Sequence, residues 1–142
     1  MKDLSTLIRL HKLEVDERRR ALAERQAVEE RLCGERARLE QELAHEQKVA
    51  AGSLQAAATY GDFARHVIHR RERLDDAIAR ARAEVARAEE SVAEAFQELK
   101  RYELAQEERQ RQRQEALRRA DTQRLDEIAS IRFQRANRDG TS

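Results

Sequence analysis

The fold follows from residues 67–106, VIHRRERLDDAIARARAEVARAEESVAEAFQELKRYELAQ. Two series of residues each recur every seven positions, and alternating steps of four and three link one series to the other. The first series is Val67, Leu74, Ala81, Ala88, Ala95 and Tyr102, and the second is Arg71, Ile78, Val85, Val92, Leu99 and Gln106. A 3.5-residue repeat over about five heptads is typical of a left-handed coiled coil. The alanines predict a partner helix that approaches closely and carries larger side chains.

The partner for this seam lies earlier in the same chain. Apolar residues between positions 4 and 51 are spaced by sums of threes and fours, which places them near one stripe of a helix. They are Leu4, Ile8, Val15, Leu22, Leu32, Leu39, Leu43 and Ala50. We interpret Gly34, in the middle of this stretch, as a point of close packing or local softness within a continuous helix.

The change of direction falls where charged residues disappear, in GSLQAAATYG at 52–61. Gly52 is typical of the left-handed residue that follows a helix. Thr59 and Asp62 have the spacing of a capping box at the start of the next helix. We therefore predict a connection at about 52–60, and so short a connection makes the two helices antiparallel neighbours.

Together these patterns predict an all-α fold, a single long two-helix antiparallel coiled-coil hairpin over 1–142. The helices are expected at about 4–51 and about 60–136, with a frayed tail at 137–142. At about 1.5 Å per residue, Leu4 lies opposite about residue 107, so the second helix is longer and overhangs. Large apolar residues are missing from 105–115 and then return in the overhang, which implies an outside partner. The returning residues are Leu117, Leu125, Ile128, Ile131 and Phe133.

Composition excludes most other classes of protein. Charged residues make up 40% of the chain and aromatic residues 4%, with no Pro and no Trp, which favours long helices over a globular enzyme core. Intrinsic disorder is disfavoured because the net charge is only +1. No apolar run is long enough for a membrane span, and the first 20 residues do not read as a signal peptide. A single cysteine, Cys33, fits a reducing compartment.

The sequence offers no catalytic constellation. His66 and His69 have the spacing of half a metal site, but two solvated histidines are the favoured interpretation. We expect no metal, no cofactor and no small-molecule substrate, and no enzymatic activity. Residues 105–142 carry nine arginines and seven acidic residues, which favours a solvated helix with internal ion pairs. The Tyr60–Phe63–Val67 cluster either plugs the end of the coil or forms an exposed apolar patch for a partner.

Three motifs carry a resemblance to a known family. They are Tyr60-x-x-Phe63 followed by Leu74 and Ile78, the run Glu98-Leu99-Lys100-Arg101-Tyr102-Glu103-Leu104, and Leu125-Asp126-Glu127 followed by Ala129 and Arg132. With the length and the longer second helix, they make the chain similar to the FliJ family of the flagellar type III export apparatus. The YscO-type proteins of injectisomes are more distant relatives.

The resemblance implies a cytoplasmic, non-enzymatic stalk that associates with the inner membrane through the export apparatus. Its partners would be the hexameric export ATPase, a membrane export gate protein and export chaperones. The implied ATPase-binding residues are Leu4, Leu7, Ile8, Leu125, Asp126, Glu127, Ala129, Ile131 and Arg132. The implied gate- or chaperone-binding residues are Leu39, Leu43, Tyr60, Phe63 and Val67.

Two other functions remain open from the residues alone. The chain could be a generic structural coiled coil that forms a homodimer. Alternatively, the arginines of the overhang could bind nucleic acid or another acidic surface, although no nucleic acid is expected as a partner because acidic residues nearly balance them.

Overall fold

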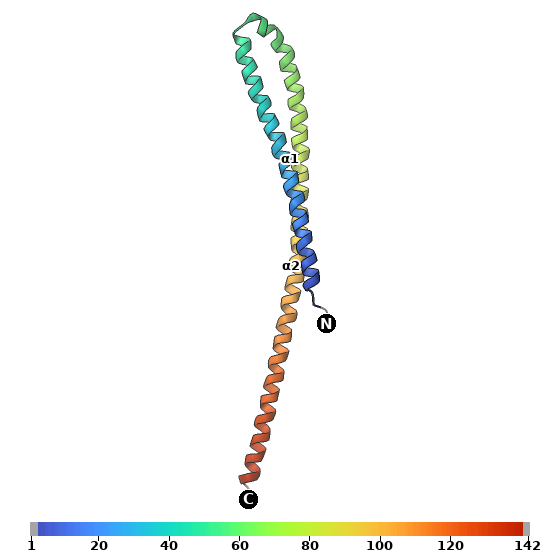
Figure 1. Ribbon diagram of the computed structural model, residues 1–142, viewed down its shortest axis with the longest axis vertical. Helices are drawn as coiled ribbons and strands as arrows, with labels where there is room; N and C mark the ends of the chain where they lie inside the picture. The colour runs from blue at the N-terminus through green and yellow to red at the C-terminus, as the bar shows by residue number, and fades with distance from the viewer. Residues whose placement is uncertain (1–2, 141–142) are drawn as a thin grey trace. The chain divides into compact units, whose positions relative to one another are not determined.

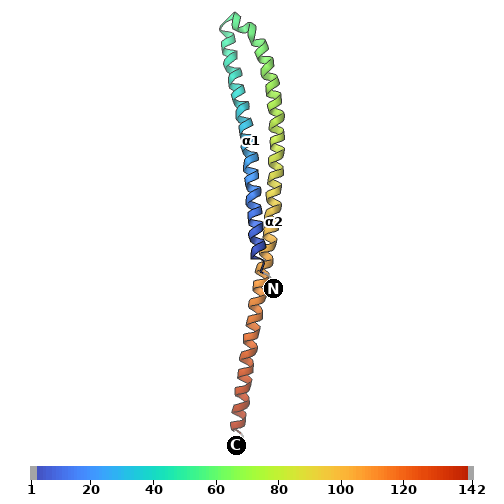
Figure 2. The ribbon, with the colours of Figure 1, turned by 45° about the vertical axis from the view of Figure 1, so that its right-hand side comes forward.

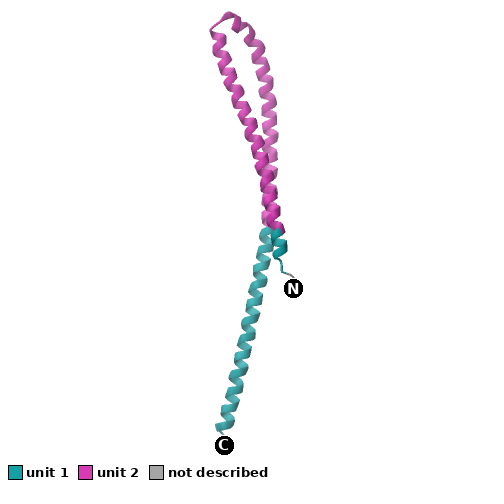
Figure 3. Ribbon diagram, viewed as in Figure 1, with its two compact units in different colours: residues 1–9, 99–142 teal, residues 10–98 magenta. Residues whose placement is uncertain are grey.

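The computed structural model describes residues 3–140 and contains two long helices, α1 at Ser5–Ala51 and α2 at Leu54–Gly140 (Figure 1). These residues include no strand, so the predicted all-α class is confirmed. The chain divides into two compact units, coloured separately in Figure 3. Unit 1 comprises Met1–Arg9 and Leu99–Ser142, and unit 2 comprises Leu10–Glu98. Within residues 3–140, neither helix has a segment long and apolar enough to cross a bilayer.

In unit 2, α1 and α2 run side by side in opposite directions, as the two views in Figures 1 and 2 show. The predicted seam of α2 is confirmed, because every member of both seven-residue series is buried or half-buried. The buried members are Val67, Leu74, Ile78, Ala81, Val85 and Ala95 in unit 2, and Leu99 in unit 1. The 3.5-residue repeat therefore identifies the face of α2 that leaves water.

The contribution of α1 is more polar. All eight apolar residues of its predicted stripe are buried or half-buried, but only Val15 and Leu39 are fully buried. Charged residues stand at seam positions between them, and Arg18, Glu29 and Arg36 are half-buried. Long side chains of this kind cover apolar surface with their aliphatic stems while the charged ends stay at the edge. Thus α1 covers an apolar seam of α2 with a mixed face of its own.

The connection is shorter than predicted, because α2 begins at Leu54 and not near residue 60. Ser53 is the N-cap, and its Oγ accepts a hydrogen bond from the Ala56 N–H at 3.4 Å. Thr59 lies inside the helix, where its hydroxyl donates to the Ala56 carbonyl at 3.1 Å, so the predicted capping box is wrong. The three alanines at 56–58 favour helix strongly enough to extend α2 through the stretch that lacks charge.

Gly52 differs from its interpretation, and Gly34 differs from one of the two interpretations given for it. Gly52 does not adopt the left-handed conformation, since no residue among 3–140 has a positive φ, and its N–H donates to the Val49 carbonyl at 3.1 Å. At Gly34, an added Cβ would meet no atom within 4 Å beyond its own helix neighbours. Close packing therefore does not explain Gly34, and the residue lies in an ordinary stretch of helix.

Unit 1 joins the start of α1 to α2. The Leu4 N–H donates to Oε1 of Gln106 at 3.3 Å, and the Gln106 amide donates to Asp3 at 2.5 Å. The predicted pairing of Leu4 with about residue 107 is thus confirmed to within one position. Every residue from 107 to 140 is exposed. The helix extends to Gly140, so the fraying expected at 137–140 is wrong, and positions 141–142 lie outside the described residues.

Candidate partner-binding site

The residues implied to bind a gate or chaperone lie mostly inside the hairpin. Leu39 and Val67 form a buried cluster with Leu74, and Val67 is only 1% exposed. Leu43 and Phe63 are partly buried and pack against that cluster. Of the two interpretations of the Tyr60–Phe63–Val67 cluster, this geometry favours the one in which it closes the end of the coil, because Phe63 and Val67 pack inside the hairpin.

Tyr60 is half-buried, and the apolar surface near the connection lies on neighbouring residues. Leu54, the first residue of α2, is 91% exposed, and Val49 on the last turns of α1 is also exposed. Neither residue belongs to the heptad series, so periodicity gave no reason to single them out. Their exposure at the turn between two helices is visible only once α2 is known to start at Leu54.

The residues implied to bind the ATPase from α2 are all exposed. Leu125 is 67% exposed and Ile131 is 51% exposed, and Asp126, Glu127, Ala129 and Arg132 are exposed around them. Leu117, Ile128 and Phe133 add further exposed apolar surface to the same segment. Large apolar side chains spaced along an isolated helix are unfavourable in water, so this segment is the strongest candidate for a partner-binding surface.

The implied residues at and just before the start of α1 lie elsewhere in unit 1. Leu4 and Ile8 are half-buried, and Leu7 is exposed. Leu4 lies beside Gln106, and Leu125 is 19 positions further along α2, which is about 28 Å of helix. The structure therefore does not bring the two halves of the implied ATPase site together into one patch.

The exposed segment of α2 has the spacing of a coiled-coil seam. Steps of four and three connect Leu117, Asp121, Arg124, Ile128, Ile131 and Arg135. At about 100° per residue these six positions, together with Leu125 and Arg132, fall within an arc of about 120°. Phe133 lies outside that arc. Hereafter the eight residues are called the open seam, because α2 has no helix beside it there within unit 1.

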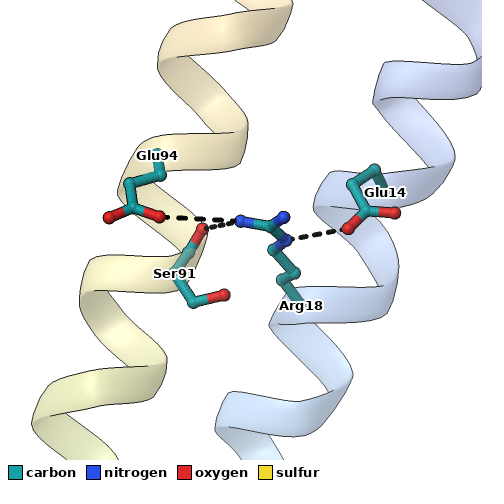
Figure 4. Close-up of polar contacts among 4 residues, drawn as sticks. All are labelled: Glu14, Arg18, Ser91 and Glu94. Atoms are coloured by element: carbon teal, nitrogen blue, oxygen red, sulfur yellow. Dashed lines mark hydrogen bonds and ion pairs between the residues drawn. The ribbon is translucent and has the colours of Figure 1, made fainter.

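Polar contacts across the hairpin were missed by the sequence reasoning, which followed only apolar residues. Arg18 occupies a seam position of α1 and is held from both helices (Figure 4). Its Nε donates to Glu14 at 2.9 Å, one turn earlier on α1. Its Nη1 donates to the Ser91 carbonyl on α2 at 3.0 Å and lies 4.0 Å from the Glu94 carboxylate. Arg18 can therefore occupy a seam position because α2 supplies a carbonyl oxygen and a carboxylate beside it.

Three further ion pairs connect α1 to α2. Arg36 pairs with Asp75 at 2.5 Å, and this hydrogen bond raises the pKa of the Arg36 guanidinium above its usual value. The other two pairs are Glu29 with Arg82 at 3.2 Å and Glu40 with Arg71 at 2.6 Å. All are partly exposed, so each contributes little to stability, but their spacing follows the heptad.

The remaining candidate residues show no arrangement for chemistry. His66 and His69 are exposed, and Cys33 is a half-buried free thiol. Among residues 3–140, no three His, Cys, Asp or Glu side chains converge as a metal site would require. In the arginine-rich stretch, Arg111 pairs with Glu108 at 2.9 Å and Arg119 pairs with Glu115 at 3.0 Å. These local pairs are those of a solvated helix.

Comparison with known proteins places these features in one family. No curated protein and no solved structure matches the chain. A family described as "Flagellar FliJ protein" matches residues 1–138, which is nearly the whole chain. The match includes both helices of the hairpin and nearly all of the exposed segment that carries the open seam. The chain therefore belongs to the FliJ family of flagellar proteins.

Proposed function

We propose that this component of the flagellar export apparatus is a non-enzymatic stalk that binds and regulates the hexameric export ATPase. It would act in the cytoplasm, at the inner-membrane face where its partners assemble. The end of α2 engages the ATPase, and the opposite end of the hairpin engages the export gate and export chaperones.

The open seam is the observation that carries this proposal. This member of a family of export components has a helix with a coiled-coil spacing of residues, three of them apolar, and all of the residues in that series are exposed. Its four large aliphatic residues contribute nothing to a core within residues 3–140, because none is buried there: Leu117, Leu125, Ile128 and Ile131. Covering them with a partner removes apolar surface from water at about 25 cal/mol per Å².

Such contacts can regulate a ring enzyme only if they differ between its states. A coupling element shifts an equilibrium by the difference in its binding free energy for the two states, and by no more than that. A helix that binds one ATPase conformation through its open seam more tightly than another changes the populations of both. No catalytic side chain is needed for this role.

Binding and ATPase stimulation test the proposal directly. The variant Leu125→Ala/Ile131→Ala should reduce stimulation of the purified export ATPase at least several-fold, while circular dichroism shows unchanged helix content. Gln123→Ala is the matched control, because it changes an exposed residue of the same helix outside the open seam. Unchanged stimulation by the double variant would remove the ATPase-binding role from this segment.

For the gate and chaperone contact we propose the apolar residues near the connection, namely the exposed Leu54 and Val49 and the half-buried Tyr60. Leu54 is the most exposed large apolar residue among those described. Leu54→Ser should lower affinity for the purified gate domain or a chaperone without lowering helix content. An equal affinity of the variant and the parent chain for both partners would exclude this surface.

A further inference from the structure

The open seam carries arginines as well as apolar residues, and its charges are unevenly distributed around α2. Arg124, Arg132 and Arg135 lie on the open seam, against a single carboxylate, Asp121. Glu115, Asp126 and Glu127 of the same segment fall outside the arc of about 120° that contains the seam. The apolar face of the segment is therefore also its basic face.

These three arginines have no ion pair within residues 3–140, in contrast to Arg111 and Arg119, which lie outside the open seam. Arg111 and Arg119 pair with glutamates of their own helix at 2.9 and 3.0 Å. The guanidinium groups of the open seam are thus available to an acceptor from another molecule. Burying them beside apolar contacts without such an acceptor would be strongly unfavourable.

Unit 2 contains the same pattern with its partner helix present. There, arginines at seam positions of one helix meet carboxylates of the other, namely Arg18 with Glu94, Arg36 with Asp75, and Arg71 with Glu40. Between these ion pairs, the buried side chains of α2 are Leu74, Ile78, Ala81 and Val85. The hairpin therefore shows, within the same chain, what kind of surface covers a helix face that mixes arginines with apolar residues.

We infer that the surface which receives residues 117–135 is a protein surface that sets carboxylates among small apolar side chains, as α2 does for α1. The inference rests on the proposed function and adds the chemistry of the ATPase surface that binds the open seam. Arg124 and Arg135 stand at seam positions and Arg132 beside them, so the receiving carboxylates are spaced by one to two helical turns.

Charge argues against two other occupants of the open seam. A second copy of this chain would bring two basic faces together, and like charges across a helix pair are unfavourable. Nucleic acid would satisfy the arginines but would leave Leu117, Ile128 and Ile131 exposed. A protein surface with acidic groups among apolar ones satisfies both parts of the pattern.

The experiment measures binding of the full chain to the purified hexameric export ATPase at several salt concentrations. The test variant is Arg124→Gln/Arg132→Gln/Arg135→Gln, and the control is Arg111→Gln/Arg119→Gln, which changes two arginines that are paired within their own helix. All five side chains are exposed, so both variants should keep the helix content of the parent chain. We expect the test variant to lose about tenfold or more in affinity at low salt, and the control less than about twofold. The test variant should also bind with a weaker dependence on salt.

The results of these variants distinguish failure of the inference from failure of the proposed function. If Leu125→Ala/Ile131→Ala weakens binding but the arginine variant binds like the parent chain at every salt concentration, the inference is wrong and the proposed function stands. If neither variant weakens binding, both are wrong. Two other results would also overturn the inference. One is that the full chain dimerises and the arginine variant does not. The other is that the chain binds DNA through the same arginines while the arginine variant keeps its affinity for the ATPase.

Discussion

Replacing Gly34 by alanine should make α1 more stable, although close packing was one of the two interpretations of glycine at this position. The residue lies far from both ends of a 47-residue helix, and no residue among 3–140 has a positive φ. An added Cβ would meet no atom within 4 Å outside its own stretch of helix. Alanine therefore fits the backbone conformation and the available space without any shift of a neighbour.

The magnitude follows from helix propensity alone. Glycine in a helix interior costs about 1 kcal/mol relative to alanine, because it loses more backbone entropy and buries less surface. About 1 kcal/mol corresponds to a rise of roughly 2–5 °C in Tm for a chain of this size. Local opening of α1 around residue 34 should become about fivefold rarer.

Thermal unfolding followed by circular dichroism measures the first effect, and amide hydrogen exchange around residue 34 measures the second. Gly61→Ala is a companion variant, because Gly61 also lies inside a helix with no atom within 4 Å of an added Cβ. Gly52→Ala is the contrasting variant. Gly52 lies between the helices, so helix propensity gives no reason for a gain in stability there, and its added Cβ would contact the Val49 carbonyl at 3.6 Å. Lower stability of Gly34→Ala would refute the reasoning, since it would mean that a neighbour approaches this position closely.

Three further predictions concern the ends and the core of the hairpin. Ser53→Ala should lower the free energy of unfolding by about 1 kcal/mol, because Ser53 caps α2. Thr59→Ala should be neutral or slightly stabilising, because Thr59 lies inside the helix. The reverse order of the two effects would favour the predicted capping box at Thr59. Val67→Ala should cost about 1–3 kcal/mol in urea unfolding because its side chain is fully buried, and a cost near zero would contradict that burial. Hydrogen bonds from Ser5 and then Gln106 lower the pKa of Asp3, so the stabilisation they give is present at neutral pH and is lost as pH falls through that lowered pKa. NMR titration of Asp3 should show a pKa below that of the variant Gln106→Ala, and equal values would exclude the contact.

The seam of α2 could be predicted in full because burial there is apolar and strictly periodic. The connection could not, because glycine and threonine have local preferences that a run of alanines overrides. The seam of α1 was predicted only in part. Arg18 and Arg36 look like surface residues in a sequence, and their half-buried positions depend on acceptors supplied by residues far away in the chain. For the same reason, the binding residues taken from family resemblance divided into exposed and buried sets only when the fold was known.

Charged residues at seam positions specify the register of the two helices, which the alanines of α2 leave ambiguous. Ala81, Ala88 and Ala95 are seven residues apart and nearly equivalent, so apolar contacts alone distinguish poorly between registers that differ by one heptad. The ion pairs do distinguish them. Arg36 with Asp75 and Glu29 with Arg82 are separated by one heptad on both helices.

A slip of α1 by seven residues in one direction would place Arg36 opposite Arg82 and would bring Glu29 near Glu89. Each pair is individually weak because it is partly exposed, yet the slipped register replaces attractions with repulsions at the same positions. The Leu4 contact with Gln106 in unit 1 agrees with the same register. The short connection at 52–53 and the charged residues of α1 therefore act together to fix the register of α1 against α2 in unit 2.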